Sequence, residues 1–229
     1  MAITDDMLKD AGLILERRPD GLAVTDGVIT VQGDFSPLLA RVRPGNLNRE
    51  LLVKAARIKG ISPKDLTAVD ATAGLGEDAL LLAAAGFEVT LFERNPIIAA
   101  LLRDALERAG TDPALADIVE RMNLVEGEST TALAMLGFQP DVVLLDPMFP
   151  AKGKDAAVKK KLQMLQKLER PCDDEDALIE AAFAAQPRKV VVKRPVKGPH
   201  LAGRKPSYTL SGKAIRFDCY ALARPGRDG

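Results

Sequence analysis

The chain has 229 residues, 47% of them hydrophobic and 28% charged, so it is long enough to bury the core of one ordinary globular domain. Lys and Arg together number 32, as do Asp and Glu, which argues against a wholly basic nucleic-acid coat protein but not against a local basic face. The single histidine, His200, cannot build a His-rich zinc site and would have to serve any Ser-His-Asp triad alone, and Cys172 and Cys219 form no CxxC pair. We therefore expect no metal site.

The start of the chain, Met1-Ala2-Ile3-Thr4-Asp5-Asp6, is acidic and does not have the pattern of a signal peptide. No apolar run approaches the roughly 20 residues that a membrane-spanning helix needs. These features predict a cytoplasmic protein with no membrane segment.

Residues 1–62 are expected to form a small N-terminal β-rich subdomain with a connecting helix. Short alternating segments between residues 21 and 35 are broken by Asp-Gly pairs at Asp20-Gly21 and Asp26-Gly27, which favour a β-hairpin. A helix is expected at about residues 48–59, ended by Ile61-Ser62-Pro63.

From residue 66 onwards, short apolar strands alternate with amphipathic helices. Gly86 ends the first of these helices and Pro96 opens the second. Strands are expected at residues 66–70, 88–93, 123–126, 142–146 and 189–193, helices at residues 77–85 and about 96–109, and a closing hairpin at residues 207–222 with a turn at Ser211-Gly212. Apolar strands separated by helices predict a parallel sheet covered on both faces, so the fold class is α/β, doubly wound.

The loop after the first of these strands is the candidate ligand site, because open α/β sheets bind ligands at the carboxyl ends of their strands. It runs from Asp70 through Gly74 and Gly76 to Glu77 and Asp78. The two glycines let the backbone turn sharply and approach a ligand closely, although tight turns also use glycine for structural reasons alone.

Glu93 ends the second strand, where a carboxylate can accept both hydroxyl groups of a ribose. NAD and S-adenosylmethionine both carry such a ribose. A dinucleotide site places glycine directly after the strand, with the pyrophosphate on the helix N-terminus, whereas here the loop is longer and its acids would repel a pyrophosphate. The same acids suit the ammonium and sulfonium groups of S-adenosylmethionine, which we favour. Taken singly, Glu93 is equally well explained as a solvated strand end and Asp78 as an acid that complements a helix dipole.

The loop after the fourth strand, Asp146-Pro147-Met148-Phe149-Pro150, resembles the Asp/Asn-Pro-Pro-Tyr/Phe loop of methyltransferases that modify exocyclic amino groups of bases. An aryl amine is a poor nucleophile because its lone pair is delocalised into the ring. The Asp146 side chain and the Pro147 carbonyl could accept its two N–H groups and aim the lone pair at the methyl carbon, while Phe149 stacks on an extruded base. The alternative is a Pro-rich turn with Phe149 in the core.

Six blocks that lie in order along the chain resemble the bacterial ribosomal RNA small subunit methyltransferase J family: residues 70–78, 92–96, 145–150, 158–160, 190–195 and 212–220. The resemblance implies a Rossmann-like seven-stranded methyltransferase domain at residues 63–229 and S-adenosylmethionine as the cofactor. It also implies methyl transfer to the N2 amine of a guanine in 16S ribosomal RNA. The residues that it places around the cofactor are Glu77-Asp78, Glu93-Arg94, Glu128-Ser129 and Asp146.

Charge is unevenly distributed along the second half of the chain. Residues 152–167 hold six lysines against Asp155, and residues 188–229 hold eleven Lys and Arg against Asp218 and Asp228. Both stretches follow predicted strands and should flank the site, as phosphate-contacting surfaces do, although Lys159-Lys160-Lys161 alone is also typical of a solvated helix face. With seven Phe, two Tyr and no Trp, a folded RNA surface is a better partner than a free strand. The candidate RNA contacts are Lys152, Lys159, Lys160, Lys193, Arg194, Lys213 and Arg216.

Together these features predict an S-adenosylmethionine-dependent methyltransferase whose partner is the small ribosomal subunit. Three alternatives stay open: a methyltransferase acting on another amine in a protein, DNA or a small molecule; a nicotinamide-dependent oxidoreductase; and a non-catalytic RNA-binding module. The last of these does not explain the acidic loop. The sequence makes no prediction of the oligomeric state.

Overall fold

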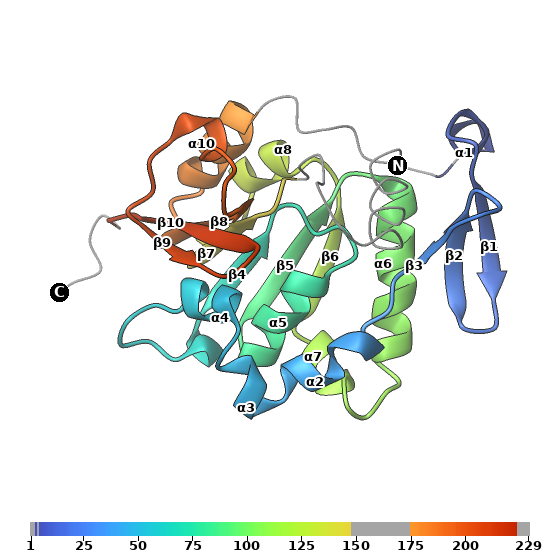
Figure 1. The fold of residues 1–229 in the computed structure, drawn as a ribbon, viewed down its shortest axis with the longest axis horizontal. Helices are drawn as coiled ribbons and strands as arrows, with labels where there is room; N and C mark the ends of the chain where they lie inside the picture. Colours follow the sequence, from blue (N-terminus) through green and yellow to red (C-terminus); the bar gives the residue numbers. More distant parts are fainter. Residues whose placement is uncertain (1–2, 4, 148–174, 224–229) are drawn as a thin grey trace.

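The computed structural model describes residues 3, 5–147 and 175–223. It contains a seven-stranded sheet and a separate three-stranded sheet formed by the N-terminal part of the chain (Figure 1). None of the described helices is long and apolar enough to cross a membrane.

The large sheet has the strand order β6-β5-β4-β7-β8-β10-β9. Strands β4 to β8 run parallel, and β10 runs antiparallel to β8 and β9, so the predicted α/β sheet and its closing hairpin are confirmed. The order reverses between β4 and β7, which is the switch point where such sheets bind ligands. The strands are β4 (Thr67–Asp70), β5 (Glu88–Glu93), β6 (Met122–Glu126), β7 (Val142–Leu145), β8 (Lys189–Pro195), β9 (Tyr208–Ser211) and β10 (Ile215–Ala221).

Helices cover both faces of this sheet (Figure 1). All of β7 is buried, with Val142 and Leu144 in one apolar cluster and Val143 and Leu145 in another. Because side chains alternate along a strand, this division shows that each face of the sheet packs against its own layer. The first cluster is shared with α5 and the second with α10. Among the described residues after β4, the α-helices are α5 (Glu77–Ala85), α6 (Pro96–Ala109), α7 (Ala116–Val119), α8 (Ser129–Ala134) and α10 (Glu175–Ala184).

The N-terminal part forms the predicted hairpin and one strand more. Strand β2 (Gly21–Thr25) pairs antiparallel with both β1 (Ile14–Arg18) and β3 (Thr30–Gln32), with the two Asp-Gly pairs at or next to the connecting turns. This sheet follows a short helix, α1 (Asp5–Asp10). It packs on α6, and Leu22, Val24 and Val31 contribute to a cluster with residues of that helix (Figure 1).

Three short helices connect the small sheet to the large one: α2 (Leu39–Val42), α3 (Pro44–Leu47) and α4 (Leu51–Ala56). The helix predicted at residues 48–59 is therefore shorter, because the backbone leaves the helical conformation at Arg57, where ψ is 135°. Phe35, Leu38 and Leu52 are buried in the same cluster as α5. The predicted domain boundary at residue 62 stays a prediction. In the structure, buried side chains between residues 35 and 56 pack in the same cluster as the large sheet.

A buried carboxylate on α6 attaches the small sheet to the rest of the protein. Asp104 accepts hydrogen bonds from the backbone N–H of Leu22 at 2.9 Å and from Nε of Arg108 at 2.8 Å, and it forms an ion pair with Arg17. Burial alone would raise the pKa of Asp104, but these donors lower it below its ordinary value.

Asp104→Ala should lower the free energy of unfolding by about 2–4 kcal/mol at neutral pH, because it leaves two guanidinium groups and an amide without their acceptor. Since the folded-state pKa is lowered, this stabilisation is present at neutral pH and is lost as the pH falls below 3.8, the ordinary value. Urea denaturation at pH 7 and at a series of pH values below 3.8 measures both effects. Glu107→Ala, at an exposed position of the same helix, is the matched control, and equal stability of the two variants would contradict the prediction.

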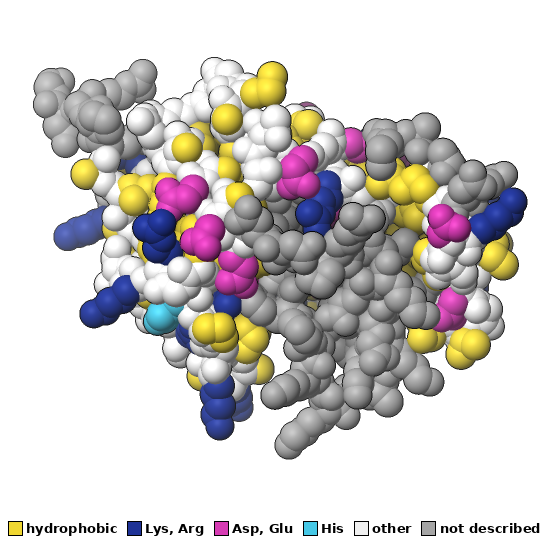
Figure 2. Space-filling model, turned by 90° about the horizontal axis from the view of Figure 1, so that it is seen from above, with side chains coloured by type: hydrophobic (Ala, Val, Ile, Leu, Met, Phe, Trp, Pro, Cys, Tyr) yellow, Lys and Arg dark blue, Asp and Glu magenta, His cyan; other side chains and the backbone are white. Residues whose placement is uncertain are grey.

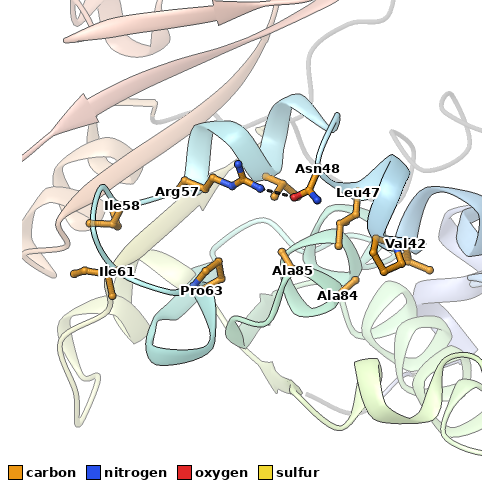
Figure 3. Close-up of a pocket in the computed structure, with 11 residues that line it drawn as sticks. Val42, Leu47, Asn48, Arg57, Ile58, Ile61, Pro63, Ala84 and Ala85 are labelled. Atoms are coloured by element: carbon orange, nitrogen blue, oxygen red, sulfur yellow. Dashed lines mark hydrogen bonds between the residues drawn. The ribbon is translucent and has the colours of Figure 1, made fainter.

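A cavity of about 400 Å³ lies between α3, α4 and the end of α5, lined mainly by apolar side chains such as Leu47 and Ile58 (Figure 3). Arg57 donates to Asn48 at its border. Ala85 ends α5 and Pro63 precedes β4, so this cavity lies at the amino ends of the strands. It therefore lies at the opposite end of the strands from the switch point between β4 and β7.

Candidate active site

Four charged residues of the candidate site lie at the carboxyl ends of strands β4, β5, β7 and β8. Asp70 ends β4, Glu93 ends β5, Asp146 directly follows β7 and Lys193 lies near the end of β8. The register pairs Asp70 with Leu144 and Leu145 with Val192, which brings these residues to one edge. The predicted site loop between β4 and α5 lies at the same edge.

The two glycines of this loop both have a positive φ, +54° at Gly74 and +76° at Gly76. At Gly76 a Cβ atom would also lie 2.7 Å from Cδ1 of Leu102, so a side chain there would be strained and crowded. Gly76 is the N-cap of α5, whose first turn carries Glu77 and Asp78. The loop therefore delivers two acids to the strand edge, with Glu77 exposed and Asp78 partly buried.

The Glu93 carboxylate is 4% exposed and is held by the backbone. Its Oε2 accepts from the N–H of Gly74 at 2.9 Å, and its Oε1 accepts from the N–H of Asn95 at 2.7 Å. The glycine loop is thereby tied to the end of β5. A carboxylate oxygen can accept more than one hydrogen bond, so a carboxylate fixed in this way fits the two hydroxyl groups of a ribose.

Asp70 is 2% exposed and is connected to the loop after β7 through Thr72. Its Oδ1 accepts from the N–H of Thr72 at 3.1 Å, and the Thr72 hydroxyl accepts from the N–H of Asp146 at 2.6 Å. Burial, together with the charges of Asp78 and Asp146, raises the pKa of Asp70 to about 7. This carboxyl group is therefore poised to ionise near neutral pH.

Lys193 bridges two carboxylates. Its Nζ lies 2.6 Å from Oδ2 of Asp78 and 2.9 Å from Oδ2 of Asp146. Burial would lower the pKa of Lys193, but these two carboxylates raise it above its ordinary value. Its charge is therefore directed into the acidic site, and the contact of Lys193 with RNA phosphates stays a prediction.

Asp146 is partly buried, and both its burial and the charge of Asp78 raise its pKa, against the opposing effect of Lys193. Asp70, Asp78 and Asp146 thus place three carboxyl groups around one ammonium. Such an edge suits a ligand with positive charge and disfavours a pyrophosphate. The arrangement fits S-adenosylmethionine, whose sulfonium and ammonium groups are cationic, better than NAD.

The remaining predicted cofactor residues lie at the ends of β5 and β6. Arg94 forms an ion pair with Glu128 at 3.5 Å, and Glu128 is the N-cap of α8. Ser129 is buried in the first turn of that helix. Glu126 pairs with Arg103 of α6 at 2.5 Å. Contact of Glu128 with an adenine ring stays a prediction.

Two of the predicted RNA contacts are buried, and the structure corrects them. Arg194 is 1% exposed and its guanidinium contacts Glu175 at 3.1 Å and the Pro199 carbonyl at 2.9 Å. Arg216 is 6% exposed and donates to Asp218 through Nε at 2.9 Å and to the carbonyls of residues 195, 196, 198 and 199. Both arginines hold the segment after β8 in place instead of facing solvent.

The other predicted site residues divide into two groups. Lys213 is exposed between β9 and β10, and Pro147 directly follows Asp146. Phe149, Lys152, Lys159 and Lys160 lie outside the described residues.

Sequence reasoning missed two features of this site. The bridging role of Lys193 had a signal in the sequence, because aligning the carboxyl ends of the fourth and fifth predicted strands places Lys193 beside Asp146. Thr72 had none, because nothing in the loop sequence singles out its hydroxyl as the acceptor for the Asp146 amide.

Comparison with known proteins agrees with this geometry. The family model described as putative SAM-dependent methyltransferase matches residues 10–222. The crystal structure of a SAM-dependent methyltransferase from Neisseria gonorrhoeae superimposes with a TM-score of 0.74 at 34% identity, covering 95% of this chain and 87% of that one. Fold, site and family match define an S-adenosylmethionine-dependent methyltransferase.

Two curated relatives specify the family within this class. One, from Pseudomonas aeruginosa (strain UCBPP-PA14), is 48% identical over 80% of this chain and 70% of its own length. Another, from Dechloromonas aromatica (strain RCB), is 41% identical over 92% of this chain and 88% of its own length. Both are named ribosomal RNA small subunit methyltransferase J. The chain belongs to the ribosomal RNA small subunit methyltransferase J family, as its sequence blocks predict.

The raised pKa of Asp70 leads to a pH-dependent preference between cofactor and product. S-adenosylmethionine carries a sulfonium cation, whereas the sulfur of S-adenosylhomocysteine is neutral. A cation favours ionised Asp70, so binding of S-adenosylmethionine releases a proton and its affinity should rise with pH relative to that of the product.

We expect the ratio of the two affinities to increase by about three- to tenfold between pH 6 and pH 8, the range that brackets a pKa of about 7. Isothermal titration calorimetry with both ligands measures this ratio. Asp70→Asn should make the ratio independent of pH over this range. Parallel pH curves for the two ligands in the wild-type protein would contradict the assignment.

Proposed function

We propose that this protein transfers a methyl group from S-adenosylmethionine to the N2 amine of a guanine in 16S ribosomal RNA of the small subunit. The observation that carries this proposal is the Asp146 carboxylate, held by Lys193 beside Asp78 at the carboxyl end of β7. The substrate class is supported by the names of the curated relatives, and an exocyclic amine as the target by the Asp146-Pro147 loop. The N2 position of guanine is carried over from the family that the sequence blocks resemble.

The chemistry follows from two hydrogen-bond acceptors. The Asp146 side chain and the Pro147 carbonyl accept the two N–H groups of the amine, which draws the nitrogen lone pair out of conjugation with the ring. The nitrogen then forms a bond to the methyl carbon, while the carbon–sulfur bond breaks and its electron pair stays on sulfur. The base stacking expected of Phe149 stays a prediction.

The product amine has gained a positive charge and must lose one proton. The Asp146 carboxylate, which already accepts one of its N–H groups, is placed to receive that proton. Its pKa is raised by burial and by Asp78, which makes it a better proton acceptor than an ordinary aspartate.

We place the RNA-facing surface at the segment that follows β8 and at the turn between β9 and β10. Lys197, Lys205 and Lys213 are exposed there, and among the described residues none of them has an ion-pair partner. The buried Arg216 fixes the backbone that carries Lys197. Figure 2 shows Lys and Arg side chains interspersed with Asp and Glu over the described part of the face seen from above. Lys152, Lys159 and Lys160 remain candidate contacts outside the described residues.

A ribosomal RNA substrate also leads us to propose the cytoplasm as the compartment.

The experiment that tests the function is transfer of labelled methyl groups from S-adenosylmethionine to 30S subunits from cells that lack this gene, followed by nucleoside digestion. Label in N2-methylguanosine supports cofactor, substrate class and target atom together. Label in another nucleoside overturns the target atom, and tight S-adenosylhomocysteine binding without any label overturns the ribosomal substrate.

A further inference from the structure

We propose that Lys193 is a positioning residue for methyl transfer, whose ammonium fixes the Asp146 carboxylate against Asp78 so that it faces the substrate amine. This inference rests on the proposed function for the reaction, but the contact between Lys193 and Asp146 on which it depends is present in the protein without substrate. It gives Lys193 a role in the chemical step and not in RNA binding.

The geometry ties three elements together at one atom. Nζ of Lys193 on β8 contacts Asp78 on α5 at 2.6 Å and Asp146 after β7 at 2.9 Å. Its side chain is 24% exposed, so solvent screens these contacts only partly. The backbone N–H of Asp146 is bonded in turn to Thr72. Asp146 is thus held at its amide by the loop after β4 and at its carboxylate by β8.

The charges around Asp146 explain why a cation is needed there. Asp78 from α5 and Asp70 from β4 are carboxyl groups whose negative charge disfavours ionisation of Asp146. The cations that favour ionisation of Asp146 are Lys193 and Arg194, both from β8, and Arg194 is already paired with Glu175. Lys193 is therefore the cation in contact with Asp146 among the described residues that face it. Without it, Asp146 would be protonated over a wider pH range and would be a weaker acceptor for an N–H group.

The bridge also connects the cofactor side of the site with the acceptor side. Asp78 lies in the first turn of the helix that follows the glycine loop, while Asp146 faces the substrate. Lys193 fixes the distance between them. Because in-line transfer depends on sub-ångström placement, loss of this bridge should lower the rate of the chemical step more than it weakens binding of either ligand.

The test compares Lys193→Met, which removes the charge and keeps the length, with Lys193→Arg, which keeps the charge. Lys59→Met, at an exposed position before β4, is the matched control. For Lys193→Met we expect kcat at pH 7 to fall by about 30- to 100-fold, with the KM for 30S subunits changed by less than about threefold. The acidic limb of the kcat profile should move to higher pH by about one unit or more. Lys193→Arg should recover much of the rate, and Lys59→Met should behave as wild type.

A second measurement does not depend on activity. The ¹³C signal of the Asp146 carboxyl, assigned by its absence in Asp146→Asn, is titrated by NMR in the cofactor-free protein. Its midpoint should be higher in Lys193→Met than in wild type by about one pH unit or more. If Lys193→Met does not fold, Lys193→Gln takes its place, because the amide keeps donors without the charge.

The outcomes separate this proposal from the proposed function. If the wild-type protein does not methylate small-subunit RNA, the proposed function fails, and the NMR titration still decides whether Lys193 controls Asp146. An unchanged Asp146 midpoint in Lys193→Met overturns the positioning role. So does a loss confined to the KM for 30S subunits with an unchanged pH profile, since that is the behaviour of an RNA contact.

Discussion

Asp146→Ala should lower kcat for methyl transfer by about 1000-fold while changing the affinity for S-adenosylhomocysteine by less than about threefold. The substitution removes an acceptor that orients the amine and takes up its developing positive charge, and loss of one such preorganised group costs about 100- to 1000-fold. Loss of alignment for in-line attack adds to this. The cofactor side is expected to change little, because Gly74, Asn95 and Glu93 form their hydrogen bonds independently of Asp146. Single-turnover transfer to 30S subunits and calorimetry measure the two quantities.

Asp146→Asn separates acceptor geometry from charge. The amide oxygen can still accept one N–H and one hydrogen bond from Lys193, but it cannot take up the proton. Its rate should lie between those of wild type and Asp146→Ala, and nearer to the alanine variant if the negative charge carries most of the effect. Turnover of Asp146→Ala at the wild-type rate would contradict the assignment of Asp146 as the acceptor. Loss of S-adenosylhomocysteine binding in both variants would instead place Asp146 in the cofactor site.

Sequence patterns predict those features of the site that depend on local sequence, such as the ends of helices and strands. Gly86 and Pro96 mark helix ends by their own conformational limits, and the observed bounds of α5 and α6 agree with the predicted ones. Parallel strands bring their carboxyl ends to one edge, so the positions of Asp70, Glu93 and Asp146 follow from the strand pattern alone. The fold class and the acidic character of the site could therefore be predicted before any contact was known.

Predictions based on charge counts fail where burial decides the role of a side chain. Arg194 and Arg216 belong to a basic stretch, yet both are buried. Arg216 and Asp218 are two residues apart in β10, a spacing that places them on the same face of a strand. Their ion pair could therefore have been predicted from the sequence. The pairing of Arg194 with Glu175 joins elements that are separate in sequence, and no local pattern reports such a contact. Basic residues near a strand end are thus ambiguous between structural and RNA-binding roles until their exposure is known.

Glu93→Ala should weaken the binding of S-adenosylmethionine and S-adenosylhomocysteine together, by about 100-fold each. The carboxylate accepts from the backbone N–H of Gly74 and of Asn95, so its removal releases the glycine loop and deprives the ribose of its partner. Hydrogen bonds to a charged group contribute about 1.5–3 kcal/mol each. A loss of about 2.7 kcal/mol in binding corresponds to a 100-fold change in Kd. Both ligands carry the same ribose, so their affinities should fall in parallel, in contrast to the selective effect of Asp70 on the sulfonium.

Two variants make this prediction specific. Glu93→Gln keeps one acceptor oxygen and donates through its amide nitrogen, so it should bind both ligands with intermediate affinity. Glu88→Ala, at the exposed opposite end of the same strand, is the matched control and should bind as wild type. Calorimetry at one fixed pH decides the outcome. Wild-type affinity in Glu93→Ala would mean that the ribose lies elsewhere, whereas weaker binding of S-adenosylmethionine alone would mean that Glu93 acts through the charge of the sulfonium and not through the ribose.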